Sequence, residues 1–128
     1  MILLDTCALI WWTLDPKKLS EVAAAACDSI EEHGASISSI SIWEIGIKIR
    51  KNKLDIGLTL EEYVRRLKLL EQVDIIPVDE HIWVENVSMA WNHRDPADRT
   101  IVATARLKRL PIVTKDEIIR DFYPDVIW

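Results

Sequence analysis

The sequence Ile2-Leu3-Leu4-Asp5-Thr6 lies at the N-terminus and decides how the rest of the chain is interpreted. Three consecutive bulky apolar residues, with no polar residue between them, are typical of a strand that is buried on both faces of a parallel sheet. This segment ends in a carboxylate and a hydroxyl. Because ligands bind beyond the carboxyl ends of the strands in an open α/β sheet, Asp5 is a candidate binding residue.

Further along the chain, apolar segments alternate with amphipathic ones, and caps or breakers separate them. We expect strands over residues 2–4, 35–40, 74–78 and 110–114, with an edge strand over 126–128. We expect helices over residues 6–14, 20–32, 41–52, 59–70, 79–91, 96–109 and 117–122. This alternation predicts an α/β fold in three α/β/α layers, with a central parallel sheet of four or five strands.

The composition indicates a single domain over residues 1–128, long enough to bury a core without disulfides. Hydrophobic residues make up 49% of the chain and charged residues 29%, which is typical of a soluble globular protein. No apolar run approaches the ~20 residues that cross a bilayer, and the N-terminus lacks the features of a signal peptide. Cys7 and Cys27 form no disulfide or metal motif, so we expect reduced thiols and a cytoplasmic location.

The formal net charge of −5 argues against a protein that coats nucleic acid, because such proteins present a basic surface. It does not exclude an enzyme that acts on nucleic acid. Carboxylates that hold divalent ions add negative charge, which the bound metal then offsets.

Four acidic residues lie at or just after the ends of expected strands, or near the starts of the helices that follow: Asp5, Glu44, Asp98 and Asp116. Each has an ordinary structural explanation. Asp5 is suited to cap the first helix and Asp116 to a turn, while Ser41 and Glu44 have the spacing of a capping box. Asp95 as the cap, Pro96 at the first helical position and Asp98 in the first turn form a helix start.

The four residues together favour a shared site. The carboxyl ends of parallel strands and the starts of the following helices meet at one edge of the sheet. Helix capping alone does not explain four anions, because serine, threonine or asparagine caps as well. Four negative charges close together repel one another unless a cation lies among them, and an all-oxygen ligand set favours Mg²⁺ or Mn²⁺ over zinc.

Four segments of this sequence resemble the motifs of PIN-domain ribonucleases, and most closely those of the VapC-type toxins of toxin–antitoxin pairs. These segments are Leu3-Leu4-Asp5-Thr6, Ser41-Ile42-Trp43-Glu44-Ile45 with Lys48, His93-Arg94-Asp95-Pro96-Ala97-Asp98-Arg99, and Val113-Thr114-Lys115-Asp116. Their combined span covers nearly the whole chain. Any one of them is a weak signal, whereas four in this order at these separations are a strong one.

The resemblance implies that Asp5, Glu44, Asp98 and Asp116 form an acidic Mg²⁺ site, with Mn²⁺ as an alternative ion. Thr114 matches a family hydroxyl that supports the site, and Thr6 neighbours the first acid. Many relatives have histidine at the position of Cys7, so that thiol receives no role. Asp95 is kept as the helix cap.

The resemblance further implies hydrolysis of RNA phosphodiester bonds, which leaves a 5′-phosphate and a 3′-hydroxyl. It implies a homodimer and a VapB-type antitoxin whose C-terminal segment lies across the groove. Two other functions remain open on the sequence. One is a phosphoacceptor signalling domain, which also has acids at strand ends; the other is a PIN-like scaffold that binds RNA or protein without cleaving.

Several cationic and aromatic residues are candidates for substrate or partner contacts. Arg94 and Arg99 flank the third acid and are suited either to substrate phosphates or to nearby carboxylates. Lys48 begins a basic run, continued by Arg50, Lys51 and Lys53, that either contacts phosphate or complements the helix dipole. His93 is interpreted as a turn residue rather than a general base.

Among the tryptophans, Trp43 is expected in the core because its helix neighbours are apolar. Trp11 and Trp12 are adjacent and do not both point inward from one helix, so we expect one of them to be partly exposed. Exposed tryptophan often anchors partners.

Overall fold

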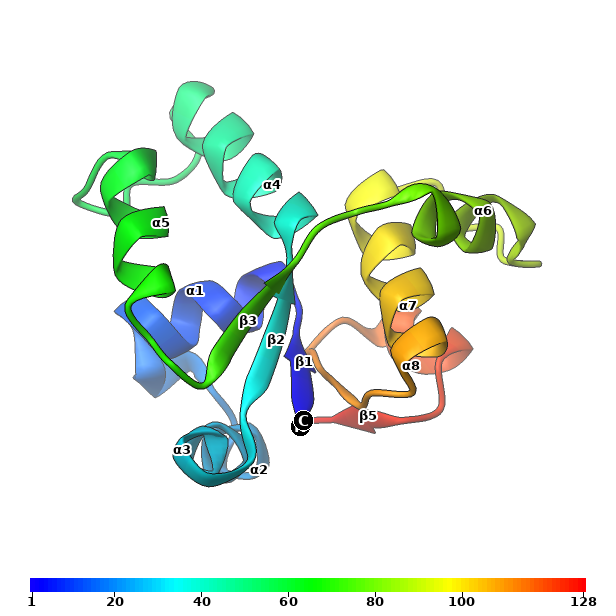
Figure 1. The fold of residues 1–128 in the computed structure, drawn as a ribbon, viewed down its shortest axis with the longest axis horizontal. Coiled ribbons are helices and arrows are strands. Elements are labelled where there is room, and N and C mark those ends of the chain that lie inside the picture. The colour runs from blue at the N-terminus through cyan, green and yellow to red at the C-terminus, as the bar shows by residue number, and fades with distance from the viewer.

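The centre of the molecule is a five-stranded sheet in the order β3-β2-β1-β4-β5, in which all neighbouring strands are parallel (Figure 1). The computed structural model describes all residues from 1 to 128. The strands are β1 (Ile2–Leu4), β2 (Ala35–Ser38), β3 (Val73–Ile76), β4 (Ile112–Val113) and β5 (Val126–Ile127). The predicted parallel α/β sheet is confirmed, including the edge strand near the C-terminus.

Eight α-helices and one short 3₁₀ helix connect and cover the strands. They are α1 (Thr6–Leu14), η1 (Pro16–Lys18), α2 (Glu21–Asp28), α3 (Ile30–His33), α4 (Ser39–Arg50), α5 (Leu60–Lys68), α6 (Glu80–Ser88), α7 (Pro96–Lys108) and α8 (Glu117–Phe122). None of these helices combines the length and the apolar character that crossing a bilayer requires.

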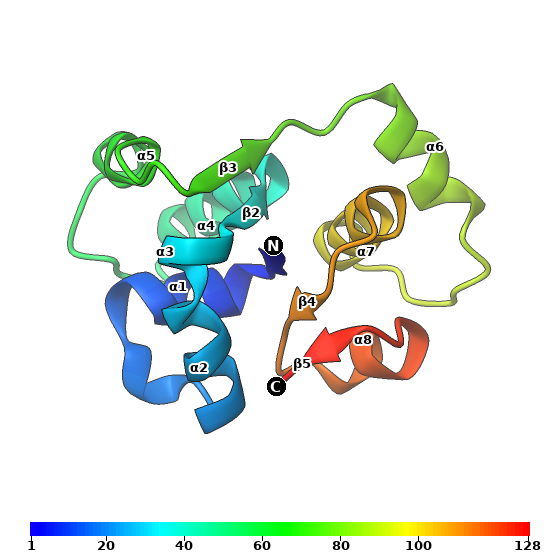
Figure 2. The ribbon, with the colours of Figure 1, turned by 60° about the horizontal axis from the view of Figure 1, so that its bottom comes forward.

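Two apolar clusters, one on each face of the sheet, produce the three predicted layers (Figure 2). Ile2 and Leu4 of β1 face the first cluster, to which α1, α2, α4 and α5 contribute buried side chains. Leu3 faces the second cluster, which α6, α7 and α8 complete. Successive side chains of a strand point to opposite faces, so one apolar strand supports both layers. The continuous apolar run at the N-terminus is therefore explained by burial on both sides.

The sheet reverses its strand order at β1, which lies between β2 on one side and β4 on the other. Leu4 is in register with Val113 of β4, and the amide of Asp5 donates to the carbonyl of Val113 at 3.2 Å. Residues that follow β1 and β4 therefore emerge side by side. This is the position at which open α/β sheets bind their ligands.

The helix predicted over residues 20–32 is two helices that meet at Ser29. The Ser29 hydroxyl donates to the carbonyl of Ala26 at 2.6 Å. A serine side chain that bonds to the backbone offers an alternative to continued helical pairing. The prediction of one continuous helix was therefore wrong at this residue.

The predicted start of α4 at Ser41 was also wrong. Strand β2 ends at Ser38, and the Ser38 hydroxyl caps the helix by accepting from the amide of Ile40 at 3.2 Å. Ser41 lies inside the helix, fully buried, with its hydroxyl 2.9 Å from that of Thr6. Because Ser41 is not the cap, Glu44 is not part of a capping box.

Trp43 was predicted in the core, but 55% of its surface is exposed. The buried residues of α4 are Ser41 and Ile45, four positions apart on one face of the helix. Trp43 lies midway between them in sequence and therefore points away from that face. Apolar neighbours in sequence did not reveal this, because they surround the helix on several sides.

We expect Leu4→Ala to lower the free energy of unfolding by about 2–5 kcal/mol, because Leu4 is completely buried in the central strand and the substitution leaves a cavity. Leu69→Ala is the matched control, since 66% of Leu69 is exposed and its truncation should change stability by less than about 0.5 kcal/mol. Urea denaturation followed by circular dichroism measures both. Equal losses in the two variants would contradict the assignment of β1 to the core.

Candidate active site

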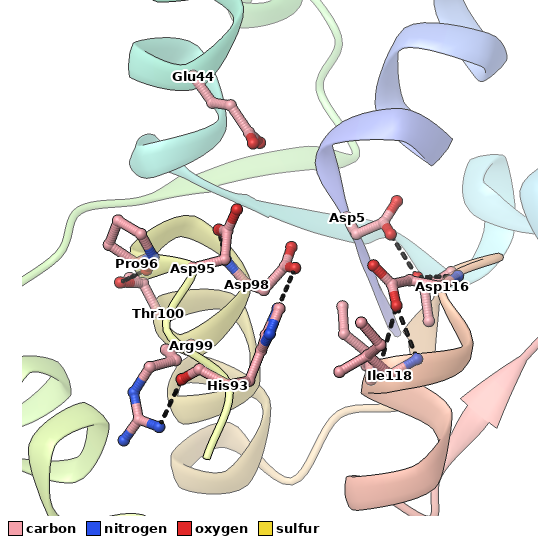
Figure 3. A network of polar contacts seen from close by, with 12 residues as sticks. Asp5, Glu44, His93, Asp95, Pro96, Asp98, Arg99, Thr100, Asp116 and Ile118 are labelled. Carbon is pink, nitrogen blue, oxygen red and sulfur yellow. Dashed lines mark hydrogen bonds and ion pairs between the residues drawn. The ribbon is translucent and has the colours of Figure 1, made fainter. Parts of the chain in front are cut away.

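The four acidic residues singled out from the sequence line one cavity of about 250 Å³ at the reversal point of the sheet (Figure 3). They come from four different parts of the chain: Asp5 follows β1, Glu44 lies on α4, Asp98 on α7 and Asp116 directly before α8. The remaining lining residues are Thr6, Cys7, Trp11, Lys48 and Lys115. The fold thus brings together side chains that are up to 111 positions apart in sequence.

Asp5 is buried and is held through both carboxylate oxygens. Its Oδ1 accepts from the amide of Ala8 at 2.8 Å, so Asp5 does cap α1. Its Oδ2 accepts a hydrogen bond from the hydroxyl of Thr114, the residue that follows β4. The Thr114 hydroxyl also accepts from the amide of Asp116 at 3.0 Å. Thr114 therefore links the first and the last of the four acids.

Asp116 has one engaged and one open carboxylate oxygen. Its Oδ1 accepts from the amides of Ile118 at 2.8 Å and Ile119 at 3.3 Å, which caps α8. No hydrogen bond of the protein engages Oδ2. Figure 3 shows the Asp116 carboxylate beside that of Asp5.

Glu44 approaches the cavity from α4, on the side away from Asp5 (Figure 3). The hydrogen bond between Ser41 and Thr6 joins this helix to the start of α1, one turn before Glu44. The Glu44 carboxylate lies 3.9 Å from the ammonium group of Lys48, four residues later on the same helix. Lys48 thus places a positive charge at the rim of an acidic cavity.

Asp95 and Asp98 have separate positions, although they are close in sequence. The Asp95 carboxylate accepts from the amide of Asp98 at 2.9 Å and caps α7, as predicted. The Asp98 carboxylate lines the cavity and lies 2.7 Å from Nε2 of His93. The interpretation of His93 as a turn residue missed this contact. The types of the residues from 93 to 98 do not reveal that the chain folds back and brings the His93 ring to Asp98.

The guanidinium of Arg99 is fully used in hydrogen bonds within the protein and is not free to bind a substrate. Its guanidinium donates to the side-chain oxygen of Asn86 and to the carbonyls of Asn86, Met89, Trp91 and His93. These five hydrogen bonds engage all five donors of a guanidinium. No donor of Arg99 is left for either of the partners expected from the sequence, a substrate phosphate or a nearby carboxylate. Arg99 instead fixes the loop that positions His93, while Arg94 is exposed.

Burial and mutual repulsion disfavour the charged forms of two of the acids. Burial, with additional repulsion from Asp98 and Asp116, raises the pKa of Asp5 to about 6 despite its hydrogen bonds. Burial also raises the pKa of Asp98 to about 6, with contributions from Asp95 and Asp116, although the contact with His93 opposes the shift. The cavity is therefore an electrostatically unfavourable place for its own carboxylates, and a cation would relieve the repulsion.

The donor set suits a hard divalent cation, because the four acids offer only oxygen ligands. No group of three or more acidic, histidine or cysteine side chains is yet arranged closely enough to hold a metal ion. Figure 3 shows Glu44 on the far side of the cavity from Asp5 and Asp116. The residues fit Mg²⁺ in chemistry and location, and ligation requires their side chains to move closer together.

Residues 2–123 match the family model described as PIN domain, so the chain belongs to the PIN domain family, a family of nucleases. The chain is 26% identical over 131 residues to ribonuclease VapC22 of Mycobacterium tuberculosis, covering 99% of this chain and 98% of that protein. It is thus a PIN-domain protein related to the VapC ribonuclease toxins.

Solved structures with the same fold include components of toxin–antitoxin complexes. A toxin–antitoxin complex from Klebsiella pneumoniae has a chain with a TM-score of 0.68 and 24% identity, covering 100% of this chain and 97% of that one. FitAcB from Neisseria gonorrhoeae gives a TM-score of 0.68 at 25% identity, with coverages of 98% and 96%. VapBC2 from Rickettsia felis, bound to a promoter DNA fragment, has a TM-score of 0.64 and a sequence identity of 16%, covering 98% of this chain and 96% of that one.

We expect Asp5→Asn to stabilise the metal-free protein at neutral pH. A carboxyl whose pKa is higher in the folded than in the unfolded state contributes instability that grows as the pH rises from about 4 to about 6 and then stays constant. A rise of this size corresponds to about 3 kcal/mol, an upper limit for the gain because asparagine alters the contact with Thr114. Urea denaturation in a chelator at pH 4.5 and pH 7.5 measures the difference.

Asp74→Asn is the control for that measurement, because Asp74 is an exposed carboxyl on β3. It should leave stability nearly unchanged at both values of pH. A lower stability of Asp5→Asn than of the wild-type protein at pH 7.5 would contradict the electrostatic account of the cavity.

Proposed function

We propose that this protein is a Mg²⁺-dependent endoribonuclease and the toxin of a VapBC-type toxin–antitoxin pair. The observation that supports this most is the single cavity lined by Asp5, Glu44, Asp98 and Asp116 at the reversal point of the sheet. Membership of the PIN domain family and similarity to ribonuclease VapC22 support the same activity. Mn²⁺ has the same ligand preferences and is the alternative ion.

Asp5, Glu44 and Asp98 would hold the metal, with the hydroxyls of Thr6 and Thr114 supporting their positions, and Asp116 would orient a water molecule or help to hold a second ion. When bound, a divalent cation supplies charge neutralisation at the phosphate and lowers the pKa of a water molecule. Hydrolysis adds the water oxygen to phosphorus and releases the 3′-hydroxyl, which leaves a 5′-phosphate on the other product.

The residues of the chain supply positioning. The free Oδ2 of Asp116 would accept a hydrogen bond from the attacking water, since Oδ1 is occupied by backbone amides. Lys48 and Lys115 line the cavity and would contact substrate phosphate oxygens. Thr114 holds Asp5 in place by a hydrogen bond. Because phosphoryl chemistry needs little covalent help from the protein, such positioning and charge complementarity are its main contributions.

The proposal includes an antitoxin and a second copy of the chain as partners. One of the structural relatives is described as a toxin–antitoxin complex, which supports an antitoxin of the VapB type that lies across the cavity. An apolar groove between α4 and α6, lined by residues that include Trp43 and Trp83, offers surface for such an assembly.

The strand order bears on one of the two alternative functions, the phosphoacceptor signalling domain, but not on the other, the non-cleaving scaffold. A phosphoacceptor signalling domain has the strand order 2-1-3-4-5, whereas this sheet has the order 3-2-1-4-5. The topology therefore argues against that class. A PIN-like scaffold that binds without cleaving is separated from the nuclease by the cleavage assay below.

We expect Asp5→Asn and Asp98→Asn each to reduce RNA cleavage by at least about 100-fold, because each removes a charge from the proposed metal site. The matched control is Asp95→Asn. This variant removes a neighbouring charge, but asparagine caps a helix as well as aspartate, so most activity should remain. A fluorescently labelled RNA with purified proteins and Mg²⁺ measures the rates.

Loss of activity in Asp95→Asn with retention in Asp98→Asn would show that the two acids have been assigned in the wrong order. Cleavage at wild-type rate by Asp5→Asn, or by the wild-type protein in excess chelator, would contradict the metal-dependent mechanism.

We expect Mg²⁺ to raise the melting temperature of the wild-type protein in a concentration-dependent manner, since an ion that binds only the folded state stabilises it by mass action. The same titration of Asp5→Asn should produce a much smaller rise. Differential scanning calorimetry with and without chelator measures both, and equal rises would contradict the proposed ligand set.

A further inference from the structure

A second cavity of about 500 Å³ lies beside the acidic one and shares three lining residues with it. Cys7, Trp11 and Lys48 line both cavities, so these three residues form the boundary between them. The other lining residues of the second cavity are Ile10, Leu14, Asp15, Lys18, Lys53, Leu54 and Asp55. It is formed by α1, the end of α4 and the segment after α4.

Trp11 is the aromatic residue of this boundary. It lies on α1 and is partly exposed, whereas its neighbour Trp12 packs against the larger core cluster. The ammonium group of Lys115 lies 6.0 Å from the centre of the Trp11 ring, and the ring of Trp128 lies 5.7 Å away at 51°. Trp11 is thus an aromatic surface at the edge of the acidic cavity, with the Lys115 cation over one face of its ring and Trp128 packed against it at an angle.

The second cavity combines an apolar wall with positive charge. Ile10, Leu14 and Leu54 provide apolar surface, and three lysines, Lys18, Lys48 and Lys53, provide cations. Two acids also line it, but both are engaged. Asp15 lies 3.8 Å from Lys18, and Asp55 accepts from the amide of Gly57 at 2.8 Å. With three lysines against two aspartates, the lining has a small formal excess of positive charge in a chain whose formal charge is −5, and Lys18 and Lys48 are each paired with a carboxylate.

We propose that Trp11 and the second cavity bind an unpaired nucleotide of single-stranded RNA next to the phosphate that is cleaved. The inference rests on the proposed nuclease function and adds a residue and a cavity, outside the acidic site, that recognise one base of the substrate. The base stacks on Trp11 against the apolar wall, and the backbone phosphates contact Lys18 and Lys53. A paired base is excluded from this position, because stacking on a side chain requires a base that has left its helix.

RNA is favoured over a protein segment as the occupant by the charges that flank the aromatic ring. Lys115 lines the acidic cavity, Lys18 and Lys53 line the second cavity, and Lys48 lines both. Cations on both sides of an aromatic surface match a polymer that alternates phosphates with bases. Occupation by the antitoxin is the competing result in the experiment.

The experiment measures binding in an Asp5→Asn background, in which RNA is not cleaved. The probe is a fluorescein-labelled single-stranded RNA of mixed sequence, followed by fluorescence anisotropy. We expect Trp11→Ala to weaken binding roughly 5- to 100-fold, the loss expected for one stacked base, and Trp11→Phe to retain most of the affinity. Leu69→Ala is the control, because 66% of the apolar Leu69 side chain is exposed and it lines neither cavity.

A second probe separates stacking from charge and from misfolding. An oligonucleotide of abasic ribose phosphate has the same charges but no bases, so Trp11→Ala should bind it as well as the parent does. Lys53→Gln should weaken binding of both probes. Tighter binding of the single strand than of the corresponding duplex is expected as well.

Three outcomes would overturn the inference. They are unchanged RNA binding by Trp11→Ala, equal losses for the normal and the abasic probe, and a loss confined to a peptide from the antitoxin C-terminus. Cleavage by the unsubstituted protein is measured in parallel. If the unsubstituted protein does not cleave RNA, the nuclease proposal is contradicted. A loss of RNA binding in Trp11→Ala supports the nucleotide site at Trp11 whether or not cleavage is observed.

Discussion

The hydrogen bond between Thr114 and Asp5 is the interaction on which the arrangement of the site depends. It joins the residue after β1 to a residue after β4, two strands that are adjacent in the sheet and more than 100 positions apart in sequence. The same threonine accepts from the amide of Asp116. One buried hydroxyl therefore fixes the relative positions of two acids, and it does so where the strand order reverses.

The acidic site also lowers the stability of the folded protein. Burial of Asp5 and Asp98 raises the pKa of each to about 6, so both acids oppose folding when they are charged. The apolar layers on both sides of the sheet supply the stability that offsets this. Carboxylates that destabilise the metal-free protein are expected where a cation binds, because unfavourable local interactions are tolerated at functional sites.

The parts of the fold that were predictable from the sequence depend on local patterns. The apolar run of β1 predicts burial on both faces, and the sequence Asp95-Pro96 predicts the start of α7. The convergence of Asp5, Glu44, Asp98 and Asp116 followed from a general rule about strand ends in parallel sheets.

The errors concern residues whose position depends on contacts far along the chain. Ser38, Ser39 and Ser41 are all suited to cap α4, but the hydroxyls of Ser39 and Ser41 contact Val78 and Thr6, and Ser38 is the cap. The five carbonyl and amide oxygens that engage Arg99 come from the end of α6 and from the segment that follows it, which has no sequence signal for these contacts. The same holds for the contact of His93 with Asp98.

The central claim is that distant carboxylates share one divalent ion, and a crystal structure grown with Mn²⁺ tests it most directly. The account predicts an anomalous density peak in the acidic cavity, with oxygens of Asp5, Glu44 and Asp98 within about 2.0–2.3 Å of the ion. An ion bound elsewhere, or an ion in the cavity with these three carboxylates still apart, would contradict it.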